Sequence, residues 1–143
     1  MNTIGFIDGI WCLFLLQIAI QDWKKRSIPK KCILGIFLCG MFRGFLLGKT
    51  GIIEGIAGIG IAFLLFFLIL CIAPGSFGGG DIKLSMGNGW YLGVEQWVES
   101  FVIGVFLAAL WILYERSYQK RGEEREIAFG PFLCLGAFFT KIL

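Results

Sequence analysis

"IIEGIAGIGIAFLLFFLILCI", at residues 52–72, is the stretch of this chain that decides its fold. Apart from Glu54 near its beginning, the stretch has no charged side chain. A bilayer core of about 30 Å requires roughly 20 such residues in helical form. The stretch therefore predicts a transmembrane helix, and its repeated glycines in "GIAGIGIA" predict close packing against a neighbouring helix.

The composition extends this prediction to the whole chain. Of its 143 residues, 57% are hydrophobic and 16% are charged, and the mean hydropathy of +0.81 lies far above that of an ordinary soluble domain. We expect an all-α fold, in which residues 1–143 form a single membrane-embedded domain with six transmembrane helices. The clear spans are 4–21, 32–48, 52–72 and 98–114, with a shorter one at 127–143 and a weaker one at 82–97.

Basic residues predict the orientation of these spans. The loop "DWKKRSIPKK", at residues 22–31, is rich in lysine and arginine, and short loops of this kind stay in the cytosol. The N-terminus is then expected outside. If the segment 82–97 crosses the membrane, the basic loop near residues 115–126 also lies in the cytosol. Because basic loops are expected there, the charge distribution favours six spans. Because the basic cluster follows the first apolar run, no cleavable signal peptide is expected.

The residue types also exclude several classes of function. The chain has no histidine, so imidazole bases and histidine metal ligands are ruled out. No Cys-x-x-Cys pair occurs, and the five cysteines are expected to be inert packing residues: Cys12, Cys32, Cys39, Cys71 and Cys134. We expect no metal and no cofactor, and the net charge of +3 gives little support for nucleic-acid binding.

Two aspartates stand out against this apolar background. Asp22 follows the first span, and Asp81 follows the third within "SFGGGDIKLS", at residues 76–85. Singly, Asp22 fits a solvated helix end and Asp81 fits a helix N-cap. The predicted topology, however, places both at the cytoplasmic edge, where a small helix bundle can bring them together.

Such a pair carries its own chemistry. Two nearby carboxylates cannot both ionise cheaply, so they share a proton. One member can then take a proton from water while the other polarises a peptide carbonyl, which is the logic of aspartic proteolysis. Gly78, Gly79 and Gly80 would let a peptide backbone approach closely, and Lys83 is expected to extend to the membrane interface.

Three stretches together resemble the type IV prepilin leader peptidase family, the GxGD aspartic proteases of the cytoplasmic membrane. They are "FGGGDIKL" at 77–84, "QDWKKRSIPK" at 21–30 and "FGPFLCLGA" at 129–137. The resemblance spans nearly the whole chain and implies that Asp22 and Asp81 are catalytic, with Gly130 and Pro131 near them. It also implies cleavage of a short basic leader from prepilin-like membrane substrates on the cytosolic side.

Longer members of that family have a cytosolic N-terminal domain with cysteine pairs and also N-methylate the trimmed pilin. This chain resembles the short forms that serve tight-adherence (Flp-type) pili or pseudopilins, so we expect cleavage without methylation.

Two alternatives remain open. Presenilin-like GxGD proteases share the glycine motif, but their first aspartate lies in a Tyr-Asp pair and a Pro-Ala-Leu element follows; here Gln21 precedes Asp22 and "GPF" lies at 130–132. A small ion-coupled transporter would also use membrane carboxylates. Its sites usually lie near the midplane on broken helices, often in repeated halves, whereas both aspartates here lie at predicted helix ends.

Overall fold

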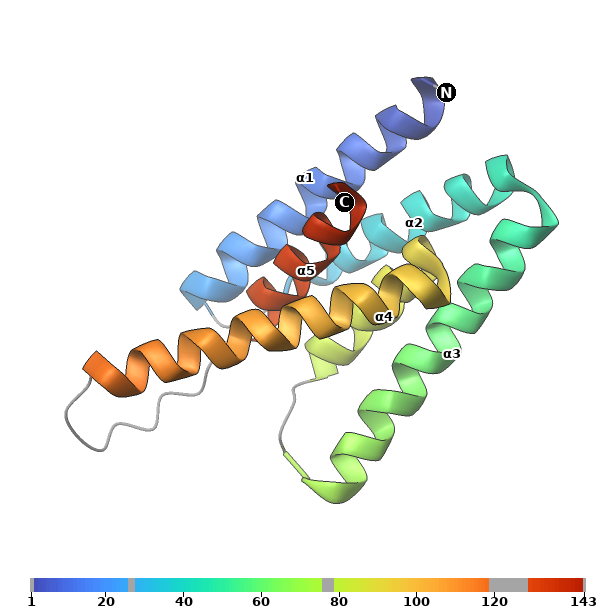
Figure 1. The fold of residues 1–143 in the computed structure, drawn as a ribbon. Coiled ribbons are helices and arrows are strands. Elements are labelled where there is room, and N and C mark those ends of the chain that lie inside the picture. Colours follow the sequence, from blue (N-terminus) through green and yellow to red (C-terminus); the bar gives the residue numbers. More distant parts are fainter. Residues whose placement is uncertain (1, 26–27, 76–78, 119–128, 143) are drawn as a thin grey trace.

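The computed structural model describes residues 2–25, 28–75, 79–118 and 129–142, and these ranges are almost entirely helical. They form five helices, in the order α1 (Asn2–Lys25), α2 (Lys30–Leu47), α3 (Lys49–Ile72), α4 (Gly79–Tyr118) and α5 (Gly130–Ile142). Helix α4 packs against α2, α3 and α5, and α1 packs against α2 and α5 (Figure 1). The α2 and α5 helices therefore lie between α1 and α4.

Helix α4 is broken at Gly93. This residue has φ 81° and ψ 176°, in the positive-φ region that glycine adopts without steric cost. The break divides α4 into arms 79–92 and 94–118, and the chain changes direction sharply between them (Figure 1). The boundary predicted between spans 82–97 and 98–114 is therefore misplaced. Trp97 was expected to end the first of these spans. It lies buried in the second arm instead, because the chain already turns at Gly93.

Three helical segments among the described residues are long and apolar enough to cross a membrane: Thr3–Lys25, Lys49–Ile72 and Gly79–Ser117. Helices α2 and α5 are not in this set: α2 carries three basic residues, and α5 has only 13 residues. The all-helical membrane architecture is confirmed. The predicted count of six helices is not, because the structure has five helical elements in the ranges it describes.

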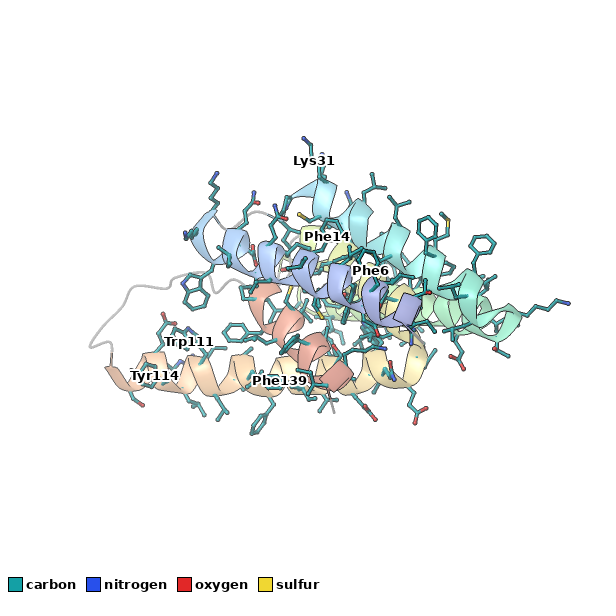
Figure 2. The ribbon with its side chains drawn as sticks, turned by 90° about the horizontal axis from the view of Figure 1, so that it is seen from above. Phe6, Phe14, Lys31, Trp111, Tyr114 and Phe139 are labelled. Atoms are coloured by element: carbon teal, nitrogen blue, oxygen red, sulfur yellow. The ribbon has the colours of Figure 1, made fainter. Side chains whose placement is uncertain are left out.

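The surface and the interior have the polarity expected of a protein in lipid. Large apolar side chains face outward, among them Ile72, Phe6 and Phe45, which are 85%, 71% and 70% exposed. Figure 2 shows side chains projecting from the bundle on every visible side, with Lys31 pointing away from it. Several polar side chains lie in the interior instead: Asp22, Ser85, Asn88, Ser100 and Thr140. Lipid has no water to satisfy polar groups, so this arrangement is the stable one.

Glycines set the closest helix contact in the bundle. The backbones of Gly58 in α3 and Gly89 in α4 touch, because a Cβ atom at Gly89 would lie 2.5 Å from the Gly58 carbonyl oxygen. The Trp90 ring packs against Gly55 of α3 and Gly40 of α2. The close packing predicted for "GIAGIGIA" is thus confirmed, and it fixes the first arm of α4 against α3.

Candidate active site

Helix ends position the two aspartates. Asp22 lies near the end of α1 and is buried, with 5% of its surface exposed. Asp81 lies in the first turn of α4 and is half-buried. The N-terminus of a helix carries a partial positive charge, so the first turn of α4 favours a carboxylate at this position. The backbone at the start of α4 therefore stabilises a negative charge on Asp81.

The first residue of α5 covers Asp22. A Cβ atom at Gly130 would overlap Asp22 Oδ2, so only glycine permits this approach. The backbone N–H of Gly130 interacts with the carboxylate, although Oδ2 itself has no hydrogen-bond partner among the described residues. Pro131 is buried beside it in the first helical turn, where its missing N–H costs no hydrogen bond. Pro131 is thus the second residue of α5.

Two apolar residues connect the neighbourhoods of the aspartates. The Ile28 side chain lies 3.4 Å from the Cβ positions of both Gly80 and Gly130. The buried Cys134 side chain lies one turn after Gly130, within electrostatic range of both Asp22 and Asp81. The starts of α4 and α5 and the end of α1 therefore meet at one end of the bundle, with Asp22 against Gly130 and Asp81 directly after Gly80.

The remaining predicted residues are less closely involved. Lys83 is exposed, and Gly79 is exposed with open space where a side chain would project. Gly78 lies outside the described residues. An open Gly79 before Asp81 leaves room for an incoming backbone, and exposed Lys83 agrees with an interfacial position.

The sequence analysis did not identify Ile28 or assign Cys134 to the site. Cys134 was expected only as a buried packing residue, and it is buried. Its spacing of four from Gly130 places the two on the same helix face, a signal that could have found it. No comparable signal exists for Ile28, which precedes α2. In the ranges that the structure describes, no group of three or more Cys, Asp or Glu residues could hold a metal ion.

Comparison with known proteins connects this geometry to a family. The type IV leader peptidase family matches residues 9–113. A prepilin leader peptidase/N-methyltransferase from Bacillus subtilis (strain 168) is 27% identical over 134 residues, which cover 93% of this chain and 54% of the relative. A protein of the same description from Pectobacterium carotovorum subsp. carotovorum is 24% identical over 135 residues, or 91% of this chain and 48% of the relative.

The chain thus spans about half the length of these curated relatives. No solved structure matches it. The family match includes Asp22, Asp81 and the helices that carry them, from α1 to the second arm of α4. Because the match covers most of the sequence, the chain belongs to the type IV leader peptidase family.

Proposed function

We propose that this chain is a membrane aspartic endopeptidase that removes the leader peptide from prepilin-like substrates at the cytoplasmic face, with Asp22 and Asp81 as the catalytic pair. The observation that carries the proposal is the packing at one end of the bundle: Gly130 lies against Asp22, and Ile28 touches both Gly130 and Gly80, which precedes Asp81. Membership of a leader peptidase family supports the peptidase activity, and the names of the two relatives support the class of substrate.

The proposed chemistry uses one ionised and one protonated carboxyl group. The ionised member takes a proton from water, whose oxygen attacks the carbonyl carbon of the scissile peptide, while the protonated member donates its proton to the carbonyl oxygen. The tetrahedral intermediate then collapses. The C–N bond breaks, the leaving nitrogen receives a proton from the carboxyl that took one from water, and the other carboxyl recovers its proton from the hydroxyl group.

The surroundings of the pair suit a peptide substrate. Open Gly79 leaves space for an extended backbone beside Asp81. The lysines at this end of the bundle, among them Lys24, Lys25, Lys30 and Lys31, support a cytoplasmic location under the positive-inside rule. A substrate with an apolar helix behind its cleavage site would keep that helix in the bilayer while its leader reaches the aspartates.

The test is cleavage of a pilin-like substrate in proteoliposomes, read by mass spectrometry. Asp22→Asn and Asp81→Asn should each lower the rate by at least about a hundredfold, because general acid–base catalysis contributes about 10²–10⁴ and needs both members. Glu99→Gln, which neutralises an exposed carboxylate elsewhere on α4, is the matched control and should cleave at the wild-type rate.

Substantial cleavage by either asparagine variant would contradict the assignment of the pair. Activity should also survive EDTA, since the proposed water activation uses carboxylates. Loss of activity that added zinc restores would indicate a metallopeptidase.

A further inference from the structure

A second polar group lies at the opposite end of the bundle. Asp8, Arg43, Tyr91 and Lys141 come together there, and we call them the far-end cluster. The Tyr91 hydroxyl donates a hydrogen bond to Asp8 Oδ1, and Lys141 Nζ lies 3.7 Å from the same oxygen. Arg43 Nη1 donates to the Tyr91 carbonyl oxygen at 2.5 Å. The sequence analysis did not foresee this cluster.

Tyr91 is the centre of the far-end cluster. Its side chain is 1% exposed and its ring stacks on Trp11 at 4.4 Å between centroids. The Arg43 guanidinium lies 5.1 Å and the Lys141 ammonium 5.9 Å from the centre of the same ring, which adds cation–π attraction. The break at Gly93 interrupts the helical hydrogen bonds after Tyr91, so its carbonyl needs another donor, and Arg43 supplies one.

The far-end cluster draws one residue from each helix that surrounds the aspartates. Asp8 is on α1 with Asp22, Tyr91 is on the first arm of α4 with Asp81, and Lys141 is on α5 with Gly130. Arg43 is on α2, which begins just after Ile28. Along each helix the two groups lie about 15–20 Å apart at 1.5 Å per residue. Helix α3 contributes to neither group.

Backbone packing alone does not join the two helices that carry the aspartates. Within the described ranges, the backbones of α1 and α4 do not approach each other closely, since α2 and α5 lie between them, and the two helices meet through side chains. The bond from Tyr91 to Asp8 and the stacking of Tyr91 on Trp11 do cross from α4 to α1. Trp23 of α1 also meets Trp111 at 5.3 Å between ring centroids, but Trp111 lies on the second arm of α4. The contacts of Tyr91 join α1 to the arm that carries Asp81.

We infer that the far-end cluster fixes the relative placement of α1 and α4, and that Asp8 and Tyr91 are thereby positioning residues for Asp22 and Asp81. A helix is stiff, so a shift or tilt at one end moves the other end. A displacement of about 1 Å at reacting groups can cost about a hundredfold in rate. The inference rests on the proposed function for its consequence on cleavage, but the placement of the helices can be measured without it.

The kinetic test uses Asp8→Leu and Tyr91→Phe. Leucine is close to aspartate in size but has no acceptor, and phenylalanine lacks the hydroxyl, so each variant removes the hydrogen bond between α1 and α4. Each should lower kcat about tenfold to a hundredfold and leave KM within about twofold, because the substrate contacts lie elsewhere. The double variant should be no worse than the poorer single variant, since both remove the same bond. Tyr114→Phe, an exposed tyrosine on the second arm of α4, and Glu99→Gln are matched controls and should retain wild-type kcat.

The structural test measures the distance between α1 and α4 at the other end. Spin labels on unnatural amino acids at positions 24 and 83, both exposed, leave the five native cysteines untouched. Double electron–electron resonance should give a narrower distance distribution in the wild type than in Asp8→Leu or Tyr91→Phe. Asp22→Asn should match the wild type, because it leaves the far-end cluster intact.

Unchanged distance distributions, or kcat losses that multiply in the double variant, would overturn the inference. If the wild-type protein cleaves no pilin-like substrate, the proposed function fails, and the distance measurement still decides whether the far-end cluster fixes the helices.

Discussion

The carboxylate of Asp22 lies where the first residue of α5 has no side chain. This contact joins residues far apart in the sequence, and it is possible because Gly130 presents only a hydrogen toward Asp22 Oδ2. At the scale of single residues, the candidate site therefore depends on an absent methyl group as much as on the two acids.

Replacing Gly130 tests this dependence. In Gly130→Ala the new Cβ would overlap Asp22 Oδ2, so the carboxylate or the start of α5 must move. We expect the rate of cleavage to fall at least tenfold, because a displacement of about 1 Å at reacting groups can cost about a hundredfold in rate. The free energy of unfolding should fall by about 1–3 kcal/mol. Thermal unfolding in detergent and the cleavage assay measure both effects.

Gly9→Ala is the matched control, because nothing lies within 4 Å of a Cβ atom at that helical position. It should retain wild-type stability and rate. A Gly130→Ala protein as active as the Gly9→Ala protein would show that the contact with Asp22 has no part in function.

The residues of the candidate site differ in how readily they can be predicted from the sequence. Asp22 and Asp81 could be proposed as site residues from the sequence, because a carboxylate in a membrane protein costs free energy and is usually kept for a function. Gly130 and Pro131 could be placed only through family resemblance. Ile28 could not be found, because it is one apolar residue among many. Asp8 could not be singled out, because its partners Tyr91 and Lys141 lie on other helices, and only the packing of the bundle brings them together.

At the scale of the helices, α3 and the first arm of α4 form the closest contact. The expected spans 4–21 and 52–72 lie within α1 and α3, because long apolar runs define helices directly. The break in α4 was misplaced because the sequence has several glycines near it, and only the fold shows that Gly93 is the one with positive φ in that helix.

Gly58 and Gly60, two residues apart on α3, provide a test of this contact. A Cβ atom at Gly58 would overlap the backbone of Gly89, whereas nothing lies within 4 Å of one at Gly60. Gly58→Ala should destabilise the protein by about 1–3 kcal/mol, since backbone atoms cannot yield as a flexible side chain can.

Gly60→Ala should leave stability within about 0.5 kcal/mol of the wild type. Both can be compared by reversible unfolding in mixed micelles. Equal stability of the two variants would mean that α3 and α4 approach less closely than described.

At the scale of the whole molecule, the site and the far-end cluster occupy opposite ends of the bundle. Lys25 lies at the end of α1 near the aspartates, and Thr50 lies at the start of α3, beyond the end of α2. Both side chains are exposed. The proposed orientation assigns the first to the cytosol and the second to the exterior.

Cysteine labelling tests this orientation in a cysteine-free background. In intact cells, Lys25→Cys should be protected from impermeant thiol reagents and Thr50→Cys should react, because basic loops stay inside. Permeabilised cells should label both and thus confirm that each variant is present. The opposite pattern would place Asp22 and Asp81 outside and would rule out cytoplasmic cleavage.

The break at Gly93 also has a consequence for the depth of the site. At 1.5 Å per residue, the arm 79–92 is about 20 Å long, and α5, with 13 residues, is similar. A hydrocarbon core of about 30 Å exceeds both lengths, so we expect the first turns of α4 and α5, with Asp81 and Gly130, to be recessed unless the lipid thins around them. Leader cleavage should therefore be faster in liposomes of short-chain lipids than in those of long-chain lipids, at equal protein and substrate density. The bilayer, by its thickness, would then set how easily water and a leader peptide reach the aspartates.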